Sequence, residues 1–239
     1  MNSLSKTFLI YGVSKGLGKA IAKLIPDSID TVYGVSRSAP EGIDNLNWIS
    51  TDLSYPEDAV HTVKKVVGED KIDILIYNVG IWENNAFTDS YNFKEVSSIE
   101  LNKIINTNIS TCIQSLQSLI DNLKRSNNAK VILIGSTWGV DNHNGKELIF
   151  SATKYALRGV AQSLREILRE DLIGVSVLNL GYLATEYEID VPTELILAET
   201  NHSLIPLSDV IQAIKFIIST TNATCVKEIL MPAMKDRNV

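Results

Sequence analysis

The sequence predicts an α/β fold in which one doubly wound parallel sheet carries helices on both faces. Short β-branched runs alternate with longer amphipathic segments along the whole chain. The runs are apolar on both faces, as the strands of a sheet covered on both sides must be. The 239 residues contain no repeat, low-complexity tract or break in composition. We therefore expect a single domain over residues 1–239, with right-handed crossovers between strands.

Seven runs predict strands, and five segments between them predict helices. The predicted strands are residues 7–11, 31–35, 47–49, 72–77, 131–134, 175–178 and 229–231. The predicted helices are residues 18–25, 56–67, 97–124, 146–171 and 207–219. Pro56, with Glu57 and Asp58 beside it, is typical of a first helical turn. Residues 182–203 show no strong strand, and a long excursion of this kind usually covers a site or is mobile.

Composition excludes several function classes. The chain has 28 acidic and 22 basic residues, a net charge of −6, and no long basic run, so we expect no nucleic-acid partner. Its apolar runs are far shorter than the ~20 residues of a membrane span, and residues 1–7 lack the cleavage site of a signal peptide. Cys112 and Cys225 form neither a disulfide framework nor a metal cluster. We expect a cytoplasmic protein without a membrane segment or a metal site.

The first predicted strand leads directly into a glycine-rich turn, Gly12-Val-Ser-Lys-Gly-Leu-Gly18. In such a turn the first glycine allows the tight bend, the second lets the backbone approach a pyrophosphate, and the third lets helix and sheet pack closely. The helix that follows presents free N–H groups and a partial positive charge to an anion. The turn therefore predicts a dinucleotide site made by Gly12, Ser14, Lys15, Gly16, Leu17 and Gly18.

The end of the second predicted strand distinguishes between the two nicotinamide dinucleotides. A site for NAD places an acidic side chain on the ribose 2′-OH, whereas a 2′-phosphate favours arginine. Arg37 stands at this position between Ser36 and Ser38, and no acid follows until Glu41. Lys15 can approach the same phosphate from the glycine turn. The two cations favour NADP(H).

These residues resemble the short-chain dehydrogenase/reductase family, and the resemblance extends over nearly the whole chain. The glycine turn is similar to the family's T-G-x-x-x-G-x-G, with Tyr11 in place of the threonine. Residues 52–53, 78–80 and 179–185 resemble its adenine-side pair, its N-A-G motif and its N-P-G-x-x-x-T motif, the last with Leu180 in place of proline. The resemblance implies a Rossmann-type NAD(P)-binding domain with cofactor contacts from Asp52, Leu53, Asn78, Val79, Gly80, Lys154, Gly181 and Thr185.

The resemblance also implies a catalytic group. Ser136 matches the family's catalytic serine, Lys154 its lysine, and Asn108 the asparagine that holds an ordered water near the lysine. In this family the lysine lowers the pKa of a tyrosine phenol from ~10, and the phenol gives its proton to the carbonyl oxygen. The nicotinamide supplies hydride to the carbon, while the serine fixes the oxygen and shares its charge.

The position of the tyrosine is occupied by Phe150, whose ring can neither give nor take a proton. Tyr155 does not replace it, because a residue one step further along a helix points ~100° away. Three interpretations remain: an engineered substitution, an enzyme with another proton donor, or a protein that binds nucleotide without turning it over. The donors considered for the second are Ser136, Thr137, Tyr182, His143 and a water molecule.

We therefore expect an NADP(H)-dependent oxidoreductase that moves hydride between the nicotinamide and a small carbonyl or alcohol substrate. The alternative is a non-catalytic NADP(H)-binding sensor or partner protein of the same fold. Substrate contacts are expected from Trp82, Ser136, Trp138 and Tyr182, although core packing explains the two tryptophans equally well. Acids within residues 182–203 disfavour a highly anionic substrate. Apolar residues on the predicted 97–124 helix favour a homodimer or homotetramer, but an ordinary core would give the same pattern.

Overall fold

The computed structural model describes residues 5–141 and 143–236, so the first four residues of the N-terminal segment considered above lie outside it. Within these residues seven strands form one sheet in the order β3-β2-β1-β4-β5-β6-β7, and every neighbouring pair is parallel. The strands are β1 (Thr7–Tyr11), β2 (Thr31–Ser36), β3 (Leu46–Ser50), β4 (Ile74–Tyr77), β5 (Lys130–Ile134), β6 (Gly174–Leu180) and β7 (Glu228–Met231). The predicted α/β doubly wound fold is confirmed.

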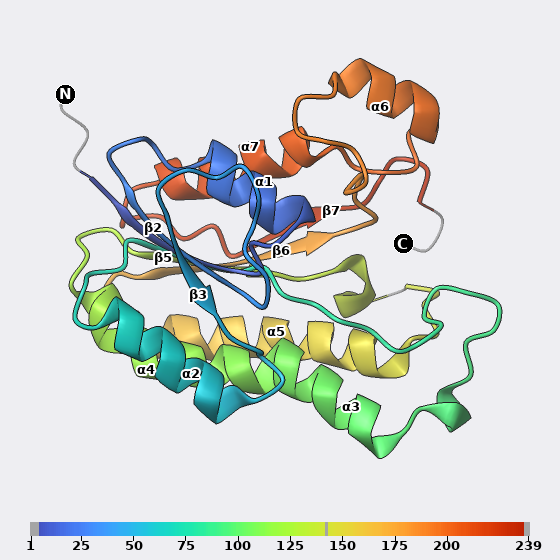
Figure 1. The fold of residues 1–239 in the computed structure, drawn as a ribbon, viewed down its shortest axis with the longest axis horizontal. Helices are drawn as coiled ribbons and strands as arrows, with labels where there is room; N and C mark the ends of the chain where they lie inside the picture. The colour runs from blue at the N-terminus through green and yellow to red at the C-terminus, as the bar shows by residue number, and fades with distance from the viewer. Residues whose placement is uncertain (1–4, 142, 237–239) are drawn as a thin grey trace.

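Helices cover both faces of the sheet (Figure 1). One face carries α1 (Gly16–Leu24) and α7 (Leu207–Ser219), and the other carries α2 (Pro56–Val67), α4 (Thr111–Lys124) and α5 (Leu148–Ile167). Side chains of each strand alternate between the two layers: Phe8 and Ile10 join the cluster beneath α1 and α7, whereas Leu9 and Tyr11 join the other. Strands β1, β4, β5 and β6 are buried along their whole length, which explains their continuous apolar sequence.

Several helices differ from the prediction. The predicted 97–124 helix consists of α3 (Ser98–Ile105), a π-helical turn (Asn106–Ser110) and α4, and the predicted 146–171 helix shortens to α5. A helix not predicted, α6 (Thr193–Thr200), lies within residues 182–203. Its apolar and acidic residues do not separate onto two faces, so it gives no amphipathic signal. Two short 3-10 turns, Phe93–Glu95 and Thr137–Gly139, complete the connections.

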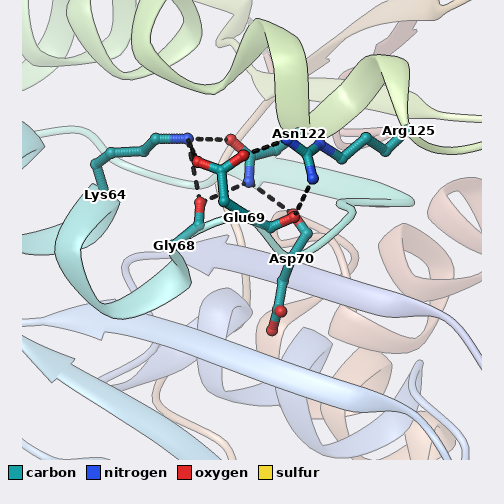
Figure 2. A network of polar contacts seen from close by, with 6 residues as sticks. All are labelled: Lys64, Gly68, Glu69, Asp70, Asn122 and Arg125. Carbon is teal, nitrogen blue, oxygen red and sulfur yellow. Dashed lines mark hydrogen bonds and ion pairs between the residues drawn. The ribbon is translucent and has the colours of Figure 1, made fainter.

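A polar network fixes the turn between α2 and β4 to helix α4 (Figure 2). Its residues are Lys64, Gly68, Glu69, Asp70, Asn122 and Arg125. The fully buried Asn122 donates through Nδ2 to the carbonyl oxygens of Gly68 (3.0 Å) and Asp70 (2.6 Å), and its Oδ1 accepts from Lys64 (2.6 Å). These bonds satisfy carbonyl groups that the turn leaves unpaired. The network thereby fixes the chain just before it enters β4.

Two further properties of the described residues bear on function. No helix among them is long and apolar enough to cross a membrane. No three histidine, cysteine, aspartate or glutamate side chains of this part of the chain are grouped so that they could hold a metal ion. Cys112 is buried and Cys225 is exposed, and both are free thiols.

Candidate active site

The turn between β1 and α1 brings backbone segments unusually close together. A Cβ atom on Gly12 would lie 2.0 Å from the carbonyl oxygen of Asn78, and one on Gly18 would lie 1.9 Å from the carbonyl oxygen of Gly12. Gly12 and Gly16 also have φ angles of +82° and +53°, in the left-handed region that favours glycine. Each glycine of the turn therefore has a structural reason to lack a side chain, and the turn packs directly on the end of β4.

A cavity of about 570 Å³ extends from this turn along the carboxyl ends of β1, β2 and β4. It lies where the strand order reverses, at β1 and β4, which is where doubly wound sheets bind ligands. Ten residues of the predicted cofactor site line it: Gly12, Ser14, Lys15, Ser36, Arg37, Asp52, Leu53, Asn78, Val79 and Gly80. We refer to it as the first cavity.

Charged groups of both signs face the first cavity. Burial would raise the pKa of Asp52, but hydrogen bonds from Ser54 and the charges of Arg37 and Lys103 lower it below its ordinary value. Asp52 is therefore a carboxylate at neutral pH. The hydroxyl of Ser36 donates to the carbonyl oxygen of Ser38 (2.7 Å), which fixes the backbone on either side of Arg37.

Seven residues of the predicted cofactor site lie outside the lining of the first cavity. Lys154, Gly181 and Thr185 line a second cavity described below, and the other four are Gly16, Leu17, Gly18 and Ser38. The side chain of Leu17 is buried in the hydrophobic cluster with Ala20 and Ile21, so only its main chain can face the turn. Ser38 is exposed, and its carbonyl oxygen is taken by Ser36.

A second cavity, of about 320 Å³, adjoins the first and shares Gly80 and Trp82 with it. All four residues predicted to contact substrate line this second cavity, namely Trp82, Ser136, Trp138 and Tyr182. Phe150, Lys154, Gly181 and Thr185 line it too. Side chains that are far apart in the sequence therefore meet at one place, because the ends of β4, β5 and β6 lie side by side.

Lys154 occupies the wall nearest the first cavity. Its Nζ donates to the carbonyl oxygens of Ile134 (3.0 Å) and Val79 (3.2 Å), and the side chain is almost fully buried. Burial disfavours the charged form and lowers its pKa to about 8. Phe150 lies one helical turn earlier on α5, with its ring centroid 5.5 Å from Nζ. Beside them, the Oγ of Ser136 accepts from the N–H of Trp138 (3.2 Å), which leaves the hydroxyl hydrogen available.

Asn108 has no exposed surface and lies in the π-helical turn. Its Oδ1 accepts from the N–H of Ile81 (2.9 Å), and its Nδ2 donates to the carbonyl oxygen of Ile81 (2.8 Å) and to Thr153 Oγ1 (3.0 Å). The side chain thus joins the segment after β4 to helix α5. Its contact with a water molecule near Lys154 stays a prediction.

His143, one of the considered proton donors, is engaged away from the second cavity. Its Nδ1 accepts from the N–H of Gly145 (3.1 Å), and its Nε2 lies 3.1 Å from Ser151 Oγ. Since Ser151 donates its own hydrogen to the carbonyl oxygen of Trp138 (2.8 Å), Nε2 must carry the imidazole proton. His143 therefore stabilises the connection between β5 and α5. Thr137 and Tyr182, by contrast, line the second cavity.

Sequence reasoning missed a group of residues that joins the connection between β4 and α3 to the start of α5. Phe87 lines the second cavity, and its N–H donates to Oε1 of the buried Glu147 (2.8 Å). In return, Oε1 of the buried Glu83 accepts from the N–H of Ile149 (2.7 Å) at the start of α5. Acids in loops are usually solvated, so neither glutamate attracts notice in a sequence. An acid in the first turn of the predicted 146–171 helix is the one indication that could have found Glu147.

Comparison with known proteins places this geometry in a family. A model of the short chain dehydrogenases matches residues 6–195. The chain is 27% identical over 196 residues to the 3-oxoacyl-(acyl-carrier-protein) reductase FabG of Escherichia coli, covering 78% of this chain and 77% of that protein. Its fold is similar to a metagenomic short-chain oxidoreductase in complex with NADP, with a TM-score of 0.77, 18% identity and coverage of 97% and 99%.

A tyrosine-to-phenylalanine variant of ElxO with NADPH bound is similar as well, with a TM-score of 0.75, 20% identity and coverage of 95% and 97%. At such identities the solved structures show the fold, while the family model carries the assignment. Because that model spans most of the chain, from before β1 to α6, the protein belongs to the short chain dehydrogenase family.

Proposed function

We propose that the chain binds NADP(H) and acts as an oxidoreductase that moves hydride between the nicotinamide and a small carbonyl or alcohol compound. One observation carries this proposal: the cavity beside the glycine turn adjoins the cavity of Ser136 and Lys154, and the two share Gly80 and Trp82. A dinucleotide lying along the first cavity has its reactive end next to a substrate in the second.

The residues of the first cavity fit a phosphorylated dinucleotide. The glycine turn offers backbone space that a Cβ atom would fill, and helix α1 begins within it, at Gly16, with free N–H groups. Lys15 and Arg37 line the same cavity and supply positive charge for a 2′-phosphate. The bound NADP and NADPH of the two structures named above support the same cofactor here.

The chain's own groups stabilise and orient a substrate oxygen. When bound, the nicotinamide would supply or accept the hydride. The hydroxyl of Ser136 has a hydrogen available for a carbonyl oxygen, because its Oγ already accepts from Trp138. Lys154, whose pKa is about 8, is mostly an ammonium at pH 7 and favours negative charge on that oxygen. The apolar walls exclude water and so strengthen both interactions.

The proton supply is the part of this mechanism that depends on Phe150. We infer that Phe150 occupies the position of the family's catalytic tyrosine, since it precedes Lys154 by four residues on the same helix and lines the same cavity. The ring preserves the shape of a tyrosine without its hydroxyl. An enzyme with this residue needs another donor, for which Ser136, Thr137 and Tyr182 in the cavity wall are the side-chain candidates.

The missing hydroxyl also favours a second function. A protein of this fold that binds NADP(H) without turning it over, as a sensor or partner, would keep the first cavity and lose the proton donor. Phe150 is consistent with this alternative, because its ring packs edge-on against Trp82 (6.1 Å) and Phe87 (5.8 Å) as an ordinary part of an aromatic cluster. Restoring the hydroxyl with Phe150→Tyr distinguishes the two functions.

Calorimetric titration with NADPH and NADH tests the cofactor assignment. We expect NADPH to bind at least tenfold more tightly, and Arg37→Ala to reduce that preference by about 10- to 100-fold, the value of a charge-assisted hydrogen bond. Lys23→Ala is the matched control, because this exposed lysine at the end of α1 does not line the first cavity. Failure of both dinucleotides to bind would refute the proposal, whereas tighter binding of NADH would refute only the choice of coenzyme.

A further inference from the structure

Aromatic side chains from four separate segments meet in the wall of the second cavity. Trp82 and Phe87 come from the connection between β4 and α3, Trp138 from the turn after β5, Phe150 from α5, and Tyr182 from the end of β6. We call these five residues the aromatic wall. The remaining apolar lining comes from aliphatic residues, among them Leu180 and Leu183.

Phe87 is the centre of the aromatic wall. Its ring centroid lies 5.5 Å from that of Trp138, in a stacked arrangement, and 5.6 Å from that of Trp82. It also lies 5.8 Å from Phe150 and 6.0 Å from Tyr182, both edge-on. These separations fall in the range in which aromatic pairs attract each other beyond simple burial. A substitution of Phe87 therefore changes the contacts of all four other rings.

The backbone of Phe87 is held in a conformation that a bulky residue rarely adopts. Its φ angle is +63°, in the left-handed region. The buried carboxylate of Glu147 holds this conformation by accepting the N–H of Phe87, while Glu83 ties the same connection to the start of α5. Strained residues that the surroundings hold in place cluster at ligand sites. The strain points to a function for the ring in the cavity.

The polar lining of the second cavity gives little support to a charged ligand. Among the described residues that line it, Lys154 is the one cation, and its amine is already bonded to Val79 and Ile134. Asp236 is the one acid of the same described lining. Within residues 5–141 and 143–236, a carboxylate or phosphate on the substrate would therefore meet no second lining cation, and burying it unpaired would be unfavourable. The volume of about 320 Å³ lies at the small end of the ~300–1,000 Å³ range of ligand pockets.

We infer that the second cavity takes a neutral, flat aromatic carbonyl compound of one or two rings, or the corresponding alcohol, and that Phe87 determines this specificity. The ligand ring packs against the aromatic wall while its oxygen meets Ser136, which lines the same cavity. A saturated ligand of equal size gains the same burial but not the ring–ring attraction. This inference deepens the proposed function and rests on it for the oxygen's position.

Binding of three ketones that each contain eight carbon atoms tests the inference without requiring turnover. Acetophenone carries an aromatic ring, cyclohexyl methyl ketone a saturated ring, and 2-octanone an open chain. We expect ligand-observed NMR titration of the NADP-loaded protein to give at least about fivefold tighter binding of acetophenone than of the other two. The anionic 4-acetylbenzoate should bind more weakly than acetophenone. Equal affinities of the three ketones, or equal binding of 4-acetylbenzoate, would overturn the inference.

Variants identify the residue responsible. Phe87→Leu keeps an apolar side chain and removes the ring, so we expect the acetophenone preference to fall about fivefold while NADPH affinity is unchanged, because Phe87 does not line the first cavity. The matched control is Phe93→Leu, at an exposed phenylalanine of the same connection that lines neither cavity. Trp82→Leu repeats the ketone comparison at a half-exposed position whose substitution spares the core. Because Trp82 lines both cavities, unchanged NADPH affinity is expected of Phe87→Leu and not of this variant. An unchanged preference in both Phe87→Leu and Trp82→Leu contradicts the assignment.

The same titrations separate this inference from the proposed function. Each ketone is measured with and without nucleotide. If neither dinucleotide binds, the proposed function fails, whatever the ketones do. If NADPH binds and the three ketones remain indistinguishable, the proposed function stands and the aromatic specificity alone is refuted.

Discussion

The ammonium of Lys154 lies 5.5 Å from the centroid of the Phe150 ring, and the two residues face one cavity from successive turns of α5. A phenol at position 150 would bring a proton-bearing oxygen next to that cation. The structure around position 150 is therefore compatible with proton transfer, while the side chain itself is not. This relationship yields the first prediction.

Phe150→Tyr should raise the rate of NADPH oxidation by carbonyl compounds. A positioned general acid contributes about 10²- to 10⁴-fold in rate, and the neighbouring lysine lowers the pKa of the new phenol toward the working range. The measurement is the loss of NADPH absorbance with a panel of aldehydes and ketones. Phe93→Tyr, which adds the same oxygen at an exposed site outside both cavities, should change nothing.

Two other outcomes of that experiment are equally informative. If both chains stay inactive while binding NADPH, the sensor or partner function is favoured. If the chain with Phe150 already turns over at an ordinary rate, another group donates the proton, and variants of Tyr182 and Thr137 would identify it.

The burial of Lys154 predicts a pH dependence of stability. Its pKa in the folded chain is about 8, below the ordinary value of 10.5, so between these pH values the unfolded chain binds a proton that the folded chain does not. The free energy of unfolding then rises with pH across this window, by up to about 1.4 kcal/mol per pH unit. Urea unfolding of the protein without nucleotide at pH 7, 8, 9 and 10, compared with Lys154→Met, isolates this contribution. A difference between the two proteins that is flat with pH would contradict the depressed pKa.

Gly18 and Gly159 provide a contrast between two helical glycines. Alanine at position 18 would bring its Cβ within 1.9 Å of the Gly12 carbonyl oxygen, whereas alanine at position 159 meets nothing within 4 Å. Gly18→Ala should lower the free energy of unfolding by more than about 2 kcal/mol and weaken nucleotide binding. Gly159→Ala in α5 should stabilise by about 0.5–1 kcal/mol, because alanine is the better helix former. Similar melting temperatures for the two variants would show that the turn is not so closely packed.

Asn122 should be a major contributor to stability far from the site. Asn122→Ala removes three hydrogen bonds of a fully buried side chain, two to the carbonyl oxygens of Gly68 and Asp70 and one from Lys64 (Figure 2), at a cost of about 2–3 kcal/mol. Asn222→Ala, which removes a single exposed hydrogen bond, is the control and should cost less than about 0.5 kcal/mol. Chemical denaturation measures both. A cost for Asn122→Ala no larger than that of the control would exclude this role for the network.

The sequence predicts the part of the site that regular structure positions. Strand ends of a parallel sheet share one edge, so the glycine turn and Arg37 could be grouped without coordinates, whereas Ser136 and Lys154 are expected from the family resemblance. The structure brings the four to two adjoining cavities. Phe87 was not predicted as a site residue, because its position depends on a left-handed backbone conformation and on a hydrogen bond to the carboxylate of Glu147, 60 residues further along the chain. Likewise, α6 and the π-helical turn leave no periodic signal. Local turn geometry and long-range hydrogen bonds, rather than hydrophobic periodicity, determine these elements.

Three further expectations from the sequence stay predictions. A homodimer or homotetramer built on the two long helices stays a prediction, as does a cytoplasmic location. Light scattering of the purified protein measures the first. The substrate-covering role expected of residues 182–203 also stays a prediction, with Tyr182, Leu183 and Thr185 lining the second cavity.

The two cavities meet at just Gly80 and Trp82 among their lining residues. Under the proposed function, most substitutions that reshape the substrate cavity would therefore leave the dinucleotide's surroundings unchanged. Selection, or protein engineering, could then alter the carbonyl compound accepted without altering the coenzyme used.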